Sequence, residues 1–237
     1  MSAADDPNAQ ASSDTPVRRR DLAVARSLDS ARVRSEGRVQ RFLDAGFELL
    51  SSAESGRDFT VQEVVDRSGQ SLRSFYQYFA GKHELLLALF DEAIRSTADR
   101  LEDQLAKEHT PLDRLHRFVV EYYRMCLPAP KGRASKNNPT PVLAEFCHQL
   151  LTAHHEEASR AFVPLVALLE KTLADAVEAG AVRQAYGGED IAGGILSTIM
   201  FNAAYASTIS GTESPDATRA PEEMWDFVAR GIATGSK

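Results

Sequence analysis

Apolar residues recur every three or four positions along most of the chain, and this spacing predicts helices rather than strands. From about Ala31 to Ser51 they fall on one face of an amphipathic helix: Val39, Phe42, Leu43, Gly46, Phe47 and Leu50. Two short helices follow, and then a long helix that runs to about Lys107. No stretch of the sequence alternates as a sustained strand does, and no internal repeat is found. The pattern predicts an all-α protein.

The two short helices have clear start and stop signals. Thr60 and Glu63 form a capping box, which satisfies free backbone donors at the start of a helix. Gly69 then supplies a turn and Ser71 an N-cap, so the next helix begins at Leu72. Two short helices joined by a glycine turn predict a helix-turn-helix.

Five further helices are predicted after Pro111, with a loop of four prolines between Pro128 and Pro141. Pro164 predicts a kink in the third of them, because proline removes a backbone donor inside a helix. Their ranges are 112–127, 142–152, 155–179, 190–207 and 221–232.

The chain has 237 residues, of which 43% are hydrophobic and 26% charged, enough for one small and one medium domain. Residues 1–16 have almost no large apolar side chain and are expected to be disordered. Residues 17–30 are basic. They could form a frayed helix or an arm that orders on DNA, and the alternative is a solvated linker. We therefore expect an N-terminal extension at 1–30, a helix-turn-helix domain at 31–82 and a larger helical domain at 83–237.

Charge is distributed unevenly along the chain. The net charge is −7, yet the segment from Val17 to Arg41 has eight arginines and only three acidic residues. Because phosphate neutralisation needs clustered basic side chains, this asymmetry predicts a small DNA-facing part attached to an acidic body.

The sequence has no feature of a membrane or secreted protein. It lacks an apolar run of about 18 residues and a signal peptide, so we expect it in the cytoplasm. Its two cysteines, Cys126 and Cys147, lie in apolar helical patterns, where a free cysteine behaves as a small buried hydrophobe. We expect neither a disulfide nor a zinc site.

The segment from Phe59 to Leu87, FTVQEVVDRSGQSLRSFYQYFAGKHELLL, resembles the DNA-binding signature of the TetR family of bacterial regulators. The matching positions are Thr60, Gly69, Ser71, Phe75-Tyr76, Tyr78-Phe79, Lys82 and Glu84-Leu85-Leu86. The detailed resemblance covers about Val39 to Ile94. It implies a three-helix DNA-binding domain joined by a long helix to a helical ligand-binding and dimerisation domain.

Five residues are candidates for contacts with DNA phosphates. Thr60 and Ser71 place helix N-termini, whose free amides and positive dipole ends attract phosphates. Tyr76, Tyr78 and Lys82 offer a hydroxyl or an ammonium group, and the resemblance implies that these positions contact the DNA backbone. Such contacts position the protein rather than select a sequence.

Four residues on or near the exposed side of the second short helix are candidates for base recognition. Arg73 could pair with a guanine edge, Gln77 with adenine, and Leu72 with a thymine methyl; Ser74 completes the set. Phe75 and Phe79 are expected to face inward.

Specific binding generally needs two recognition helices about 34 to 36 Å apart, so we expect a homodimer on a palindromic double-stranded DNA operator. The resemblance implies that the last two helices of each subunit form the interface. Its candidate residues are Ile195, Ile199, Phe201, Trp225, Phe227 and Val228, which could instead be ordinary core.

Between these helices and the DNA-binding domain lie aromatic and aliphatic residues that could form a pocket for a small apolar or amphipathic effector. The candidates are Phe118, Tyr122, Met125, Phe146, Phe162 and Leu165; the same pattern also arises from helix packing. The resemblance implies a repressor that an effector releases from DNA.

Two other functions have some support in the sequence. An activator or a ligand-independent regulator would use the same motif. A metal-binding helical-bundle enzyme has its best case in Glu145 and His148, with His154 or His155 nearby, but a second such pair is missing. We therefore expect no enzyme activity, no cofactor and no metal site.

Overall fold

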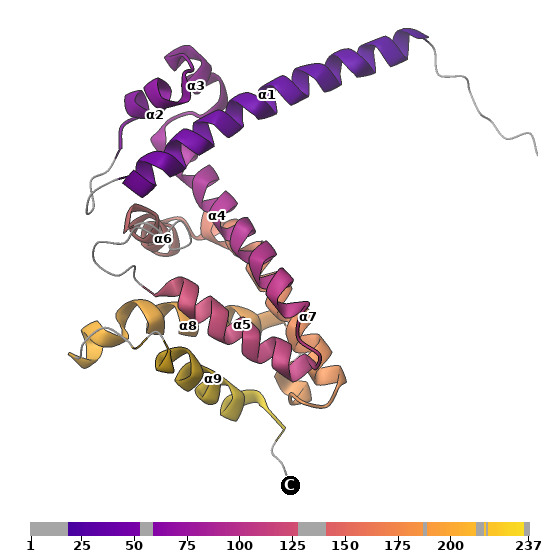
Figure 1. Cartoon of the computed structure of the whole chain (residues 1–237), viewed down its shortest axis with the longest axis vertical. Coiled ribbons are helices and arrows are strands. Elements are labelled where there is room, and N and C mark those ends of the chain that lie inside the picture. The colour runs from indigo at the N-terminus through magenta and orange to yellow at the C-terminus, as the bar shows by residue number, and fades with distance from the viewer. Residues whose placement is uncertain are drawn as a thin grey trace, which may run out of the picture. The chain divides into compact units, whose positions relative to one another are not determined.

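The computed structural model describes residues 19–52, 59–127, 141–186, 189–211, 216 and 218–234. These residues are mainly helical (Figure 1), and among them extended pairing is limited to one isolated bridge between Val182 and Ala233. The prediction of an all-α protein is confirmed. Contacts divide the chain into two compact units, residues 1–41 and residues 42–237.

The first helix, α1 (Arg19–Ser52), begins twelve residues before the predicted start near Ala31. The described part of the segment 17–30 is therefore helical, and its described side chains are exposed to solvent. Its alanine, leucine and arginine residues favour a helix, and the first glycine of the helix comes only at Gly37. The side chains of Arg32 and Glu36 pair one turn apart at 2.8 Å. The predicted disordered tail, residues 1–16, lies outside the described residues.

In the second unit, residues 42–52 of α1 pack with two short helices, α2 (Val61–Ser68) and α3 (Leu72–Tyr78). The ring of Phe42 lies 5.5 Å from that of Phe75 and 6.0 Å from that of Phe79, edge to face in both pairs. Phe75 is fully buried and Phe79 nearly so. The predicted inward face of α3 is confirmed.

The remaining helices follow the predicted order with small changes at their ends. They are α4 (Lys82–Leu105), α5 (Pro111–Cys126), α6 (Pro141–Ala153), α7 (His155–Glu178), the short 3-10 helix Gln184–Tyr186, α8 (Glu189–Ser210) and α9 (Arg219–Ile232). Pro164 lies inside α7, which continues through it. Most of the proline loop, at 128–140, lies outside the described residues.

The larger hydrophobic core is built around α5, which packs against α4, α7, α8 and α9 (Figure 1). Phe118 of α5 and Leu165 and Leu169 of α7 are fully buried in it. No described helix is long and apolar enough to span a lipid bilayer.

Candidate nucleic-acid interface and ligand cavity

The start of α2 is held by the predicted capping box. The Thr60 hydroxyl accepts a hydrogen bond from the Glu63 amide at 3.2 Å, and the Glu63 carboxylate accepts one from the Thr60 amide at 2.7 Å. This exchange fixes the first turn of an eight-residue helix. It also occupies the Thr60 side chain, so a phosphate contact at this position would come from the backbone of α2.

The turn between α2 and α3 needs a glycine. Gly69 has φ 64, in the left-handed region that other residues rarely adopt. Two residues later the Ser71 hydroxyl accepts a hydrogen bond from the Ser74 amide at 3.1 Å and caps α3. Both signals were predicted, and both are confirmed as structural features.

The outer face of α3 presents the polar groups expected of a recognition helix. Leu72, Arg73, Tyr76 and Gln77 are exposed, and the helix contains no acidic residue. Ser74 differs from the expectation, because its hydroxyl oxygen is buried and has no hydrogen-bond partner among the described residues. The α3 face that is available to a partner is therefore smaller than predicted.

Tyr78 and Lys82 lie beside this face, at the end of α3 and the start of α4. Both side chains are half-buried. The Lys82 ammonium lies 4.9 Å from the centroid of the Phe59 ring, which holds the cation near the helix-turn-helix. Contacts of either residue with DNA remain predictions.

A cavity of about 450 Å³ lies in the larger helical part of the chain, which is in the size range of small-molecule sites. Four predicted pocket residues line it: Tyr122, Met125, Phe162 and Leu165. Further lining side chains are Phe47, Phe90, Ile94, Leu143, Met200 and Phe201, with polar groups from Ser96, Thr97, Arg100 and His148.

The prediction is wrong for Phe118 and Phe146, neither of which lines the cavity. Phe118 is fully buried in the core. The Phe146 ring instead packs against the rings of His83, at 5.4 Å, and Phe90, at 6.2 Å. Helical spacing identifies a buried face but does not distinguish core from cavity wall.

Sequence reasoning missed Arg100, which brings a guanidinium group to this largely apolar cavity. It donates a hydrogen bond at 3.3 Å to the hydroxyl of Thr97, which also lines the cavity one turn earlier on α4. The i, i+3 spacing of these two residues was the available signal, and it is too common on helix surfaces to point to a site.

Both cysteines line the cavity and are free thiols. Burial raises the pKa of Cys126 to about 12 and that of Cys147 to about 11. Burial also raises the pKa of Tyr122, which is hydrogen-bonded to Cys126, well above its ordinary value. This part of the cavity wall therefore favours neutral groups.

The candidate interface residues on α8 and α9 divide into two sets. Ile195, Ile199 and Val228 are buried within the single chain, so for them the alternative of ordinary core holds. Trp225 is half-buried beside the ring of His116, at 5.1 Å. Phe201 and Phe227 are 45% and 67% exposed, which is unusual for phenylalanine and leaves them available to a second surface.

The helix-turn-helix region is similar in sequence to known bacterial regulators. Residues 42–89 match the sequence model of the bacterial regulatory proteins of the tetR family. The uncharacterised HTH-type transcriptional regulator YvdT of Bacillus subtilis (strain 168) is 28% identical over 72 residues, 30% of this chain. The matched region spans 36% of that relative's length.

Solved structures share the fold over most of the chain. A TetR family transcription regulator from Marinobacter aquaeolei VT8 is 16% identical with a TM-score of 0.56, over 86% of this chain and all of that one. The fatty acid degradation regulator FadR from Bacillus halodurans is 15% identical with a TM-score of 0.58, over 82% of this chain and 95% of that one. FadR from Bacillus subtilis, in complex with stearoyl-CoA, is 13% identical with a TM-score of 0.53, over 81% of this chain and 98% of that one.

Proposed function

We propose that this chain is a transcriptional regulator of the TetR family, whose sequence model its residues 42–89 match, and that it is a homodimeric repressor of a palindromic operator. A small apolar or amphipathic effector, bound in the cavity of about 450 Å³, would release it from DNA in the cytoplasm. Members of this family are regulators and not enzymes.

The observation that supports DNA recognition most directly is the outer face of α3. Arg73 and Gln77 lie four residues apart, one helical turn, and both are exposed. Arginine can bind a guanine edge through two hydrogen bonds, and glutamine can do the same with adenine. Behind them, Phe75 and Phe79 anchor the helix in the aromatic core with Phe42. A rigid helix with two such side chains is suited to the major groove.

The experiment that tests this function is selection of bound sequences from a random pool of duplex DNA, using the purified chain. We expect a palindrome bound by two subunits, with affinity that falls steeply as salt rises, because phosphate contacts release counterions. A folded protein that enriches no sequence, with or without candidate effectors, would contradict the proposal.

We propose that the dimer forms through the outer faces of α8 and α9. Phe227 is the most exposed phenylalanine among the described residues, and it borders a groove between these helices with Ile191, Gly194 and Thr198. Small residues on α8 allow a partner helix to approach closely, and the phenylalanine would be covered by it.

The variant Phe227→Asp should dissociate the dimer, because an unpaired carboxylate would be buried in the interface. Sedimentation velocity measures the change. Val163→Asp is the matched control, since Val163 is 58% exposed on α7, outside the proposed interface. If Phe227→Asp remains dimeric, the interface lies elsewhere.

We propose that the effector has an apolar body and one polar group. The cavity wall is mainly apolar, and the Arg100 guanidinium offers hydrogen-bond donors at one part of it. A structural neighbour holds stearoyl-CoA, a ligand of this general chemistry, which supports the choice of fatty acids and acyl thioesters as first probes.

Thermal shift and loss of operator binding would both report such a ligand. Ala144 and Ala153 are exposed alanines on α6, but only Ala144 lines the cavity. Ala144→Phe should therefore weaken effector binding, and Ala153→Phe should leave it unchanged. Equal behaviour of the two variants would argue against this cavity.

An activator with the same motif is the second candidate. Mapping the selected operator against the promoter separates the two, because a repressor site overlaps the polymerase site and an activator site lies upstream of it.

A further inference from the structure

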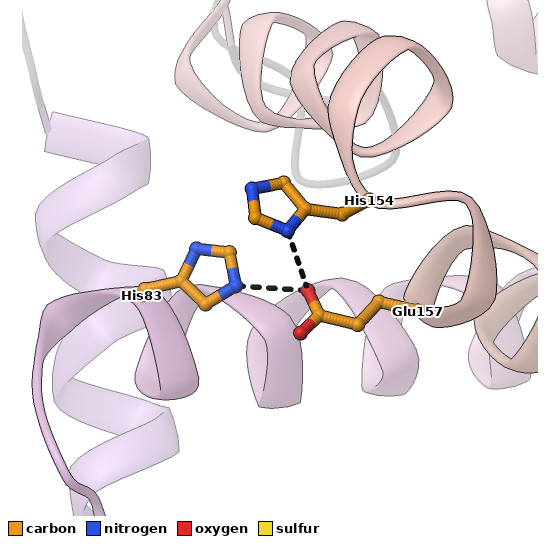
Figure 2. Close-up of side chains that lie close together, drawn as sticks. All are labelled: His83, His154 and Glu157. Carbon is orange, nitrogen blue, oxygen red and sulfur yellow. Dashed lines mark hydrogen bonds and ion pairs between the residues drawn. The ribbon is translucent and has the colours of Figure 1, made fainter.

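Two imidazoles and one carboxylate converge where the start of α4 meets the start of α7 (Figure 2). His83 Nε2 lies 2.8 Å from Glu157 Oε2, and His154 Nδ1 lies 3.8 Å from the same oxygen. One ligand atom from each residue lies within 4.8 Å of the other two. Of the metal-ligand candidates that the sequence offered, His154 belongs to this cluster, whereas Glu145 and His148 are exposed side chains outside it.

We propose that His83, His154 and Glu157 bind a divalent transition-metal ion of the zinc type. Two imidazole nitrogens and one carboxylate oxygen are a ligand set that zinc uses in proteins, with the fourth position left to water. Ligand atoms about 2.1 Å from a tetrahedral ion lie about 3.4 Å apart, a value between the two distances to the Glu157 oxygen, 2.8 and 3.8 Å. The change needed to admit an ion is a movement of side chains.

The surrounding structure already restricts these three side chains. The His83 ring packs against the rings of Phe146, at 5.4 Å, and His154, at 5.0 Å. His154 directly precedes α7, and Glu157 lies in the first turn of that helix. The three side chains keep 48%, 47% and 27% of their surface exposed, so an ion could enter from solvent.

A plain ion pair explains the cluster less well. An exposed pair of this kind contributes little to stability and needs only one histidine. Two protonated imidazoles with ring centroids 5.0 Å apart would repel each other. A metal ion would bind both rings in their neutral form.

The site would tie the start of α4 to α7. His83 is the neighbour of Lys82, a predicted phosphate contact, so an ion bound here would hold that lysine in one position. Metal binding should therefore strengthen operator binding; this consequence rests on the proposed function, whereas the metal site itself does not.

The test of the site is titration of the full chain with Zn²⁺ in competition with a chromophoric chelator, without DNA. We expect one ion per chain, and affinity lower by about tenfold or more in His83→Ala, His154→Ala and Glu157→Gln. The control variants His109→Ala and His155→Ala change exposed histidines outside the cluster and should bind as the unaltered chain does. Circular dichroism checks that each variant keeps its helices.

Co²⁺ offers a second measurement, because its absorption is intense in a tetrahedral site and weak in an octahedral one. The unaltered chain should show the intense bands, and His154→Ala should lose them. Absence of binding in the unaltered chain, or equal loss in the controls, would overturn the site.

Operator binding is then measured with Zn²⁺ and with EDTA. Tighter binding with Zn²⁺ in the unaltered chain, and no difference in His154→Ala, supports the link to DNA. Equal affinities in the unaltered chain would overturn that link. A chain that binds Zn²⁺ but no DNA would instead contradict the proposed function, so the two failures are distinguishable.

Discussion

The two short helices of the DNA-binding part and the long helices of the larger part reach stability by different routes. In α2 and α3, side chains of Thr60 and Ser71 cap helices of eight and seven residues. The 24-residue helices α4 and α7 have no side-chain cap at their start. A short helix has few internal hydrogen bonds to offset its nucleation cost, so its ends matter; a long helix is stabilised by the apolar face that it buries.

The functional chemistry differs in the same way. The candidate DNA contacts are exposed side chains of a few consecutive residues, such as Arg73 and Gln77. The candidate effector cavity is lined by residues of α1, α4, α5, α6, α7 and α8. A surface on one helix can be located from local sequence, whereas a cavity depends on how several helices pack.

The largest effect is expected in the aromatic core that supports α3. Phe75→Ala should lower the free energy of unfolding by about 3 to 5 kcal/mol, since it removes a fully buried ring that contacts Phe42 and Phe79. Chemical denaturation measures this. Tyr76→Ala is the control on the same helix, at a side chain that is 56% exposed. An equal loss in both variants would mean that burial does not separate the two faces of α3.

The next prediction concerns the exposed face alone. Arg73→Ala should weaken operator binding by about 1 to 3 kcal/mol and relax the preference for one base in each half-site. The free energy of unfolding should not change in this variant, because the Arg73 side chain is exposed. Binding to a set of operators with single base changes measures the effect; equal weakening on every sequence would assign Arg73 to the phosphate backbone.

Lys82→Ala provides the contrast to Arg73→Ala. It should lower affinity on all sequences and reduce the dependence of binding on salt. An unchanged salt slope would contradict a phosphate contact by Lys82.

Two helix caps allow a direct test of whether operator binding depends on the DNA-binding part alone. Thr60 caps α2, and Thr110 caps the longer helix α5 through the Asp113 amide at 3.1 Å. Thr60→Ala and Thr110→Ala should each cost about 1 kcal/mol in unfolding free energy. Only the first should also weaken operator binding, which fluorescence anisotropy would show. If the Thr110 variant weakens it equally, the two parts are more strongly coupled than these contacts indicate.

The smallest effect is expected at the cavity thiols. Burial raises the pKa of Cys126 to about 12 and of Cys147 to about 11, so almost no thiolate forms near neutral pH. Their reaction with a disulfide reagent should be slow at neutral pH and should accelerate as the pH approaches those values. In denaturant the thiols should have a pKa of about 8.5, so the same reaction should become fast at a lower pH than in the folded chain. Fast reaction of the folded chain at neutral pH would show that the cavity wall is open to water.

Local sequence was sufficient for much of the fold and for the scaffold of the DNA-binding site. The signals are the capping box at Thr60, the left-handed turn at Gly69 and the N-cap at Ser71. In each of them the hydrogen-bond partner lies no more than four positions away in the chain, so local sequence contains both partners. The buried face with Phe75 and Phe79 follows from helical periodicity.

The same reasoning was incomplete where two faces of a helix compete for burial. It did not show that the Ser74 hydroxyl is buried, or that Ile195 and Ile199 belong to the core of a single chain. It also extended the cavity wall to Phe118 and Phe146. Periodicity states that a side chain is covered, but the element that covers it is decided by packing.

By itself, then, the sequence determined the order of the helices, the turn between α2 and α3, and the exposure of Leu72, Arg73, Tyr76 and Gln77 on α3, because hydrogen bonds and caps link residues a few positions apart. Only the tertiary structure placed Arg100 at the cavity and brought His83 to Glu157 across 74 positions of the chain. Such contacts form because long helices must bury their apolar faces against one another. The polar groups that meet in this way are far apart in the chain, so local sequence contains no signal of their contact.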